Sequence, residues 1–432
     1  MKHLPACRVC ATSVLLFLAI SAKMMAQEPE PSAKNRPSKL LYNVIDLGPV
    51  GPPPGGPFMI NQNGFTGGSA SGQDGAEHAT HWLGRAQLDL GTPGLGGLNS
   101  FGFGVNESAR VVGGAQTTDA DGEDFCGFNA FGFPRSNTTC RPFIWRYGVM
   151  RALPTLGGPN GYANMINDRG EIVGIAETSI QDPDCSVHRF NPVVWTNGEP
   201  HALTTPGDFY GVAAYVNESG QVVGASGSCA PFNANSLLYL NELRAMFWEA
   251  NGQPHELPSL GGAGGIAGNH ACNLNSLGEA VGHSELTNNT TFHATLWRKL
   301  NKVVDLGTLE GDYGSLALGI NDRGIVVGAS LDTDFNPRAF VWQQNTLTDM
   351  NKLVHENAGI YLLFAESVNN RGEIVGFGAT TAGEVHGFQA IPIDRDGDFD
   401  AGVIPLPRPM LSDPARERLR RELARLHVRR PQ

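Results

Sequence analysis

Apolar residues occur in short runs along the whole chain, and polar turn sequences separate the runs. One arrangement recurs: an apolar residue, Asn, two variable residues and Gly precede β-branched residues and a second Gly. Clear copies read INDRGEIVG from Ile166 and VNNRGEIVG from Val368. An Asn side chain can bond the backbone two residues on, and Gly tolerates the left-handed conformation. Each copy therefore predicts a β-hairpin.

The hairpin pattern occurs seven times, with 45 to 61 residues between successive Asn residues. In the second copy Ala109 stands where Gly is expected, so we expect a different turn there. The Asn residues are Asn61, Asn106, Asn167, Asn217, Asn275, Asn321 and Asn369.

Two further elements follow each hairpin, so that every repeat holds four short strands, called A to D. Strand A precedes the Asn, strand B is the β-branched run, and strand D carries a Leu-Gly motif. Strand C ends in Trp in six repeats, at Trp82, Trp145, Trp195, Trp248, Trp297 and Trp342. Four strands at this period are typical of a propeller blade, in which we expect each indole ring to pack between neighbouring blades.

The ends of the repeat region favour a closed ring over a solenoid. Residues 42–48 read as a lone strand D, whereas the last repeat supplies strands A, B and C and stops near Ile393. Pairing these ends leaves no open sheet edge. The sequence thus predicts an all-β fold over residues 40–393: a seven-bladed β-propeller of four-stranded antiparallel blades, closed by an N-terminal outer strand that joins the last blade.

The segments outside the repeats indicate export and two linkers. Residues 1–26 combine basic residues, an apolar run and small residues near Ala26, which is typical of a signal peptide, so we expect a secreted protein. Residues 27–39 read as a disordered linker, and 394–411 as an acidic and then Pro-rich one. Residues 412–432 predict a basic amphipathic helix, which we expect to dock on the propeller or to fray rather than to contact a membrane.

Composition narrows the class of partner and permits disulfides. The 55 glycines suit a turn-rich protein, and the net charge of −11 argues against a nucleic-acid partner. After export, five cysteines remain. The pairs we expect are Cys126–Cys140 and Cys185–Cys229, with Cys272 left over.

Three neighbouring repeats have enlarged loops between strands B and C. The distance from Asn to Trp is 39, 28 and 31 residues in blades two, three and four, against 21 or 22 in the others. Loops on a rigid scaffold usually carry binding, so we expect these to form a wall on one face. The largest holds Phe125, Phe128, Phe131 and Phe133, which form either a surface for a protein or carbohydrate or a small satellite core.

Two acidic stretches are candidates for calcium, with solvated linker as the alternative. Alternating carboxylates suit a hard cation, but the second stretch lacks the glycine and the closing Glu of a calcium loop. The residues are Asp119, Asp121 and Glu123 in the large loop and Asp394, Asp396 and Asp398 after the last repeat.

The repeat unit resembles the bacterial extracellular HAF repeat family, named after a His-Ala-Phe triplet. The matching positions in strand C are His78–Thr80, His293–Thr295 and Arg338–Phe340, and Asp305–Leu309 reads DLGTL. The resemblance covers most of residues 40–393, although no strict triplet occurs. It implies a secreted repeat protein and brings no catalytic residues with it.

Taken together, these features favour a non-catalytic, monomeric binding or scaffold protein without a required cofactor, which contacts a protein or glycan through loops on one face. The alternative is a glycosidase-like or lyase-like propeller enzyme with carboxylates at the channel mouth. Asp, Glu or His side chains that converge in that mouth favour the enzyme, whereas an apolar loop wall favours the partner.

Overall fold

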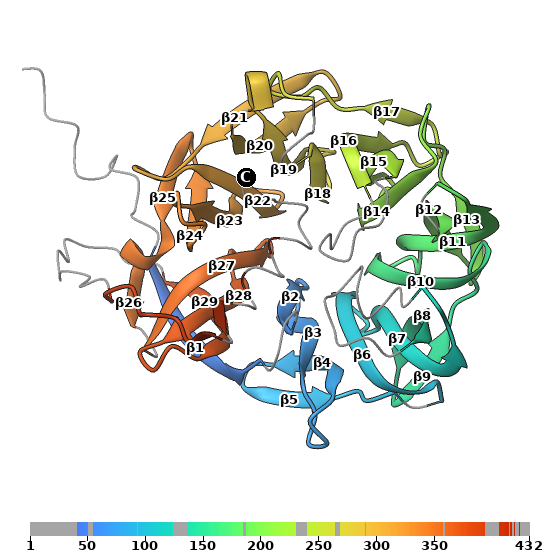
Figure 1. The fold of residues 1–432 in the computed structure, drawn as a ribbon. Helices are drawn as coiled ribbons and strands as arrows, with labels where there is room; N and C mark the ends of the chain where they lie inside the picture. The colour runs from blue at the N-terminus through green and yellow to red at the C-terminus, as the bar shows by residue number, and fades with distance from the viewer. Residues whose placement is uncertain are drawn as a thin grey trace, which may run out of the picture. The chain divides into compact units, whose positions relative to one another are not determined.

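The computed structural model describes residues 41–50, 55–92, 94–123, 137–184, 187–229, 240–263, 268–289, 291–356, 359–393, 406–413, 415, 416, 419 and 423. Seven antiparallel sheets follow one another round a ring in this part of the chain (Figure 1). The fold is a seven-bladed β-propeller, as the repeat pattern predicts.

Six blades contain four strands that follow one another in sequence, from the channel outward. Blade one comprises β2 (Gly56–Ile60), β3 (Phe65–Ser71), β4 (Glu77–Leu83) and β5 (Ala86–Asp89). Blade two comprises β6 (Gly96–Val105), β7 (Val111–Ala120), β8 (Thr138–Arg146) and β9 (Val149–Ala152). Blade three comprises β10 (Gly157–Ile166), β11 (Ile172–Asp182), β12 (Val187–Thr196) and β13 (Glu199–Ala202).

The next three blades repeat this order. Blade four comprises β14 (Tyr210–Val216), β15 (Val222–Cys229), β16 (Leu240–Trp248) and β17 (Pro254–Glu256). Blade five comprises β18 (His270–Leu274), β19 (Ala280–Glu285), β20 (Phe292–Arg298) and β21 (Lys302–Gly307), with a 3₁₀ turn at Thr287–Asn289. Blade six comprises β22 (Gly314–Ile320), β23 (Val326–Leu331), β24 (Pro337–Gln343) and β25 (Thr346–Asp349), followed by a 3₁₀ turn at Met350–Lys352.

Blade seven joins the two ends of the repeat region. Strands β27 (Ile360–Val368), β28 (Ile374–Thr380) and β29 (Val385–Ile393) pair in order, and β1 (Leu41–Pro49) adds antiparallel to β29. Val44 lies opposite Ala390 and Asp46 opposite Phe388, so the expected closure is confirmed; β1 and β29 lie side by side in Figure 1. A short strand that the sequence did not indicate, β26 (Val354–Glu356), pairs parallel with β1 as a fifth strand.

The turn between strands A and B has the same form in all seven blades, including blade two. The N–H of the fourth turn residue donates to the Asn carbonyl, from Gly170 to Asn167 at 3.1 Å and from Ala109 to Asn106 at 3.0 Å. Ala109 has φ +53°, close to the conformation that glycine takes elsewhere. The expectation of a different turn at Ala109 is therefore wrong, because alanine enters the left-handed region here at a cost of about 1–2 kcal/mol.

The tryptophans of strand C lie between neighbouring blades. All six are buried, and each belongs to an apolar cluster drawn from its own blade and the preceding one. Trp195, for example, packs with Val112 and Leu153 of blade two. Burial of such a ring contributes roughly 2–3 kcal/mol of transfer free energy, so these residues stabilise the contact between blades.

The C-terminal segment packs on blades five to seven. Ser412 begins a helix, since its hydroxyl accepts the N–H of Ala415 at 3.3 Å. Leu419 and Leu423 are buried in a cluster with apolar residues of β20, β22, β23, β27 and β28. Among the described residues, no helix has the length and apolar character needed to cross a membrane.

Candidate functional site

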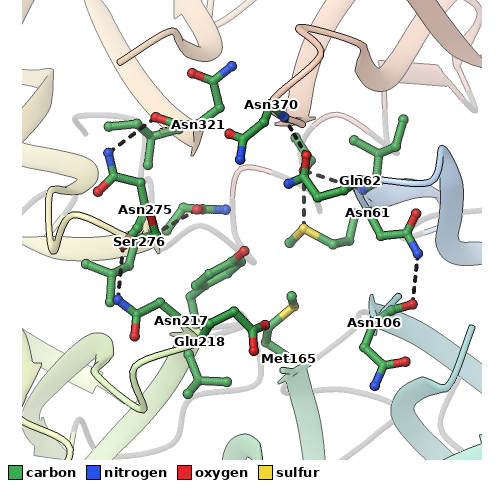
Figure 2. Close-up of a pocket in the computed structure, with 18 of the residues that line it drawn as sticks. Asn61, Gln62, Asn106, Met165, Asn217, Glu218, Asn275, Ser276, Asn321 and Asn370 are labelled. Atoms are coloured by element: carbon green, nitrogen blue, oxygen red, sulfur yellow. Dashed lines mark hydrogen bonds between the residues drawn. The ribbon is translucent and has the colours of Figure 1, made fainter. Parts of the chain in front are cut away.

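The seven repeated Asn side chains join the blades in a closed ring. Each side-chain oxygen accepts N–H groups of its own turn, as Asn321 does from Arg323 and Ile325 at 3.0 Å. Each amide nitrogen donates to the backbone carbonyl of the Asn in the next blade, at 2.8–3.2 Å (Figure 2). The last bond runs from Asn369 to Asn61 and closes the circle. The sequence predicted the first role of these residues but not the second.

A second polar ring lies beside the first, formed by the residue that follows each Asn. In six of the seven blades the backbone N–H of this residue donates to the side chain of its counterpart in the next blade, at 2.6–3.2 Å. Four of the seven side chains are carboxylates. The ring consists of Gln62, Glu107, Asp168, Glu218, Ser276, Asp322 and Asn370.

These two rings surround the mouth of the central channel, where a cavity of about 190 Å³ opens. Residues just before the Asn positions also line it: Ile60, Val216 and Ile320 are apolar, whereas Tyr215, Asn273 and Ser367 are polar. Lys, Arg and His do not occur among the described residues that line it. The nearest arginines, Arg169 and Arg371, form ion pairs with glutamates of their own turns. The mouth therefore combines four acidic side chains with apolar and neutral polar ones.

The crowding of acidic groups shows in their ionisation. Burial raises the pKa of Glu107, and the neighbouring carboxylate of Asp168 raises it further. Burial and Asp168 act in the same direction on the pKa of Glu218. Burial also favours a higher pKa for Asp322, but hydrogen bonds from Ser276 and Asn370 outweigh it and leave that pKa below its usual value. A cation in the mouth would relieve the repulsion among these groups.

The histidines that recur at the start of strand C form a structural pattern away from the mouth. His78, His293 and His386 each contact an Asp of strand D with Nδ1, at 2.9–3.0 Å. That Asp also accepts the N–H of the Gly two residues later, as Asp305 does from Gly307 at 2.8 Å. The His of the strand C motif and the Asp of the DLG motif therefore fasten strand D to strand C.

The predicted loop wall lies partly outside the described residues. Phe125, Phe128, Phe131 and Phe133 fall there, as do Cys126, Cys185, Asp394, Asp396 and Asp398. Cys140 is fully buried in β8. The two disulfides and the calcium site after the last repeat therefore stay predictions.

The three acidic residues in the described part of the large loop have different surroundings. Asp119 is exposed. Asp121 accepts a hydrogen bond from the side chain of Asn160 at 3.0 Å. Glu123 lies against His188 of blade three, with 2.6 Å between its Oε1 and Nδ1 of the histidine. The structure thus separates Asp119 from the other two residues, which face blade three.

Comparisons with known proteins add little to these observations. No family model matches the chain, and no curated protein matches it. Among solved structures, puromycin hydrolase is 11% identical with a TM-score of 0.45, over 84% of this chain and 57% of that one. An acylaminoacyl peptidase from Pyrococcus horikoshii is 7% identical with a TM-score of 0.44, over 83% of this chain and 53% of that one.

A lectin from Aleuria aurantia is 9% identical with a TM-score of 0.30, over 83% of this chain and 97% of that one. The matched segments span just over half the length of the hydrolase and the peptidase. Likenesses this distant carry no argument about function.

Proposed function

We propose that the protein is a non-catalytic binding protein that holds a cationic group of its partner in the acidic mouth of the propeller channel. One observation carries the proposal: four carboxylates, Glu107, Asp168, Glu218 and Asp322, stand round one cavity whose described lining contains no basic residue. A concave site lined by one sign of charge concentrates ligands of the opposite sign. The primary amine of a lysine side chain is the simplest group of this kind.

The volume of the cavity limits what can enter. Its volume of about 190 Å³ lies below the roughly 300–1,000 Å³ of most small-molecule pockets. This suits one side chain or a small amine and is too small for an extended glycan. The methylene stem of a lysine would lie against apolar lining residues such as Ile60, Val216 and Ile320 while the amine stays at the carboxylate ring.

Carboxylates that converge in the channel mouth are the feature expected of the enzyme alternative, but their hydrogen bonds favour binding. Both oxygens of Glu107 accept backbone N–H groups, from Gln62 and Asn63, and both oxygens of Glu218 face the N–H of Asp168. A carboxylate held in this way retains lone pairs for a cationic donor, because each oxygen can accept more than one bond. Both carboxylates are turned toward backbone N–H groups of the preceding blade, an arrangement that suits holding a cation better than taking a proton from a substrate.

The test is a calorimetric titration with two ligands that differ only in charge, Nα-acetyl-lysine amide and its Nε-acetylated form. We expect the charged ligand to bind and its affinity to fall as salt rises. The double variant Glu107→Gln, Glu218→Gln should weaken binding at least tenfold. Glu199→Gln on the exposed outer strand β13 makes the same chemical change away from the mouth and should have no effect.

Equal affinity for the two ligands would overturn the proposal, as would a double variant that binds like the wild type. Turnover of a glycoside or polyuronide by the wild type, lost in the same variant, would establish the enzyme alternative instead.

A second contact surface is proposed on the enlarged loops of blades two to four. It is favoured by two exposed apolar side chains, Ile180 at the end of β11 and Phe209 before β14. The guanidinium of Arg189 lies 4.1 Å from the centre of the Phe209 ring. Exposed aromatic and arginine side chains are enriched in contacts with proteins and sugars. A glycan array with and without calcium tests the carbohydrate branch.

The cellular setting is part of the same proposal. We propose that residues 1–26 direct export and that the chain is a monomeric member of the HAF-type repeat proteins. The repeat supports the family assignment, because the Asn residues make the same contact between blades in all seven blades and the His–Asp contact recurs in three. Fractionation of cells that express the full chain, with and without residues 1–26, tests the export step.

A further inference from the structure

On blade three, one buried carboxylate departs from the repeat. Glu177 of β11 is 0% exposed. The equivalent positions of other blades hold uncharged residues, Gln116, Gly227 and Leu331 among them, although blade five has Glu285. Burial of a charged side chain costs desolvation free energy, which a hydrogen-bonded or oppositely charged partner must offset.

The two oxygens of Glu177 have different surroundings. Oε2 accepts hydrogen bonds from the backbone N–H of Asn160 at 2.9 Å and from its side-chain amide at 3.0 Å. Oε1 is completely buried and accepts no hydrogen bond from the described residues. Its environment contains a second acid, Glu123, and burial together with that carboxylate raises the pKa of Glu177. Hydrogen bonds therefore fix Oε2 of Glu177, whereas Oε1 lies near a second acid.

Glu123 and His188 reach this point from the enlarged loops of two different blades. Glu123 ends the described start of the loop in blade two, and His188 begins the strand that ends the loop in blade three. One ligand atom from each of Glu123, Glu177 and His188 lies within 4.8 Å of the other two. The backbone N–H of His188 also donates to both oxygens of Glu123, at 3.2 and 3.1 Å, which fixes the orientation of that carboxylate.

A second layer of contacts supports these three side chains. Besides holding Glu177, the amide of Asn160 donates to Asp121 at 3.0 Å, and its oxygen accepts the N–H of Cys140 at 2.9 Å. Outer contacts of this kind orient the ligands of metal sites. Hydrogen bonds from Asn160 therefore orient the cluster, which distinguishes it from a group of unsupported surface acids.

We propose that Glu123, Glu177 and His188 form a site for a divalent transition-metal cation, of which Zn²⁺ is the first to test, and that the cation ties the enlarged loops of blades two and three together. Two carboxylate oxygens and one imidazole nitrogen are a donor set that zinc accepts with a water as fourth ligand. Calcium prefers oxygen ligands alone and more of them, so the imidazole argues against it. The site shares only Glu123 with the calcium ligands expected from the sequence.

Binding would change the proton balance of the cluster in a defined way. Donors 2.0–2.1 Å from a tetrahedral zinc lie roughly 3.3 Å apart, so the 2.6 Å contact between Glu123 and His188 must lengthen slightly. Both acids bind the cation as carboxylates, so any proton on them is released to solvent. His188 binds as neutral imidazole through Nδ1, the nitrogen that now faces Glu123.

The experiment compares the full chain with two variants and a control. After treatment with EDTA, we expect the wild type to bind one Zn²⁺ per chain with submicromolar affinity and to unfold at a higher temperature when zinc is restored. Glu177→Gln and His188→Gln should each weaken zinc binding at least 100-fold. The control is the double variant Glu199→Gln, His201→Gln, which makes the same two changes on the exposed strand β13 of the same blade and should bind as the wild type does.

Cobalt provides a readout that does not depend on folding stability. Co²⁺ in this site should give the visible absorption of nitrogen and oxygen ligands without a thiolate charge-transfer band, which separates it from binding at the half-buried Cys272. Circular dichroism confirms that each variant folds before titration. The proposal is wrong if the wild type binds no stoichiometric Zn²⁺, Mn²⁺ or Co²⁺, or if Glu177→Gln and His188→Gln keep full affinity. Failure here leaves the amine titration unaffected, because that titration concerns the channel mouth.

Discussion

The closed ring of Asn side chains makes one prediction that separates the two roles of the repeat motif. Asn321 is 3% exposed, accepts two N–H groups of its own turn and donates its amide to the carbonyl of Asn369 at 2.9 Å. The substitution Asn321→Asp preserves the shape of the side chain and both acceptor bonds of the turn. It removes only the donor, so it tests the link between blades six and seven without disturbing the hairpin.

The expected loss in the free energy of unfolding follows from the new surroundings of the Asn369 carbonyl in the variant. A buried acceptor without its donor costs about 1–3 kcal/mol, and a carboxylate oxygen in place of the amide adds repulsion and desolvation. We expect a loss of about 2–4 kcal/mol in the free energy of unfolding at pH 7. The pH dependence provides a second check, since a protonated carboxyl can donate again.

The sign of that dependence can be stated in advance. Repulsion from the carbonyl and burial raise the pKa of the introduced carboxyl in the folded protein above its unfolded value of about 3.9. The folded state then binds the proton more tightly than the unfolded state does, so the defect is small below the unfolded pKa and grows as pH rises through the folded pKa.

The assay is urea denaturation followed by tryptophan fluorescence, with the midpoint compared at equal slope. The control is Asn197→Asp in the exposed turn between β12 and β13, which we expect to change the free energy of unfolding by less than about 0.5 kcal/mol. If Asn321→Asp behaves like this control at pH 7, or if its defect does not shrink at low pH, the bonds between blades do not stabilise the ring.

Two further pairs of variants test individual contacts with the same assay. Ala109→Gly should stabilise the protein by about 0.5–1 kcal/mol, because relief of the left-handed strain exceeds the entropy that glycine adds to the unfolded chain. Gly324→Ala, at φ +72° with nothing within 4 Å of the added Cβ, should destabilise it by about 1 kcal/mol. A destabilised Ala109→Gly variant or a stabilised Gly324→Ala variant would contradict the strain argument. Trp195→Phe should cost about 1–2 kcal/mol more than Trp82→Phe, since the Trp195 indole donates to Pro154 at 2.7 Å while the buried Trp82 nitrogen has no partner among the described residues. Equal losses would show that the indole hydrogen bond contributes nothing.

The ring and its closure could be predicted from the sequence because they depend on local chemistry that recurs. Asn at a turn and Trp at the end of a strand are each visible in a single copy, and seven copies fix the period. The unpaired first strand can then pair only with the last blade, which lacks its outer strand. The prediction failed at Ala109, where it treated the left-handed conformation as closed to alanine. The bonds of Asn106 to its own turn and to Asn167 hold that turn in place against the strain.

The acidic mouth was missed, although its signal is present in every repeat. The residue after each Asn varies in identity, from Gln62 to Glu107 to Ser276, and a search for identical letters passes over it. All seven are polar and able to accept a hydrogen bond, which is the property that the contact with the neighbouring blade requires. Comparison of chemical type rather than identity would have found the ring.

The cluster at Glu177 could not be found in this way, because its members belong to two blades and to no shared motif. Glu123 and His188 are 65 residues apart, and only the angle between blades two and three brings them together. The enlarged loops mark this region only as a departure from the repeat. Which side chains those loops direct toward Glu177 depends on the path of each loop, and strand periodicity carries no information about that path.

The two acidic sites differ in what their oxygen atoms are free to do, and this difference decides what each can bind. At the channel mouth the carboxylates of Glu107 and Glu218 already accept backbone N–H groups, so they act on a ligand through their field and through remaining lone pairs. In blade three, Oε1 of Glu177 is buried beside another acid and accepts no hydrogen bond from the described residues. The electrostatic field of the mouth carboxylates attracts any cation that fits, and salt screens it. The buried acids and the imidazole near Glu177 instead need a cation bound directly between them. Salt should therefore weaken amine binding at the mouth far more than it weakens zinc binding at Glu177.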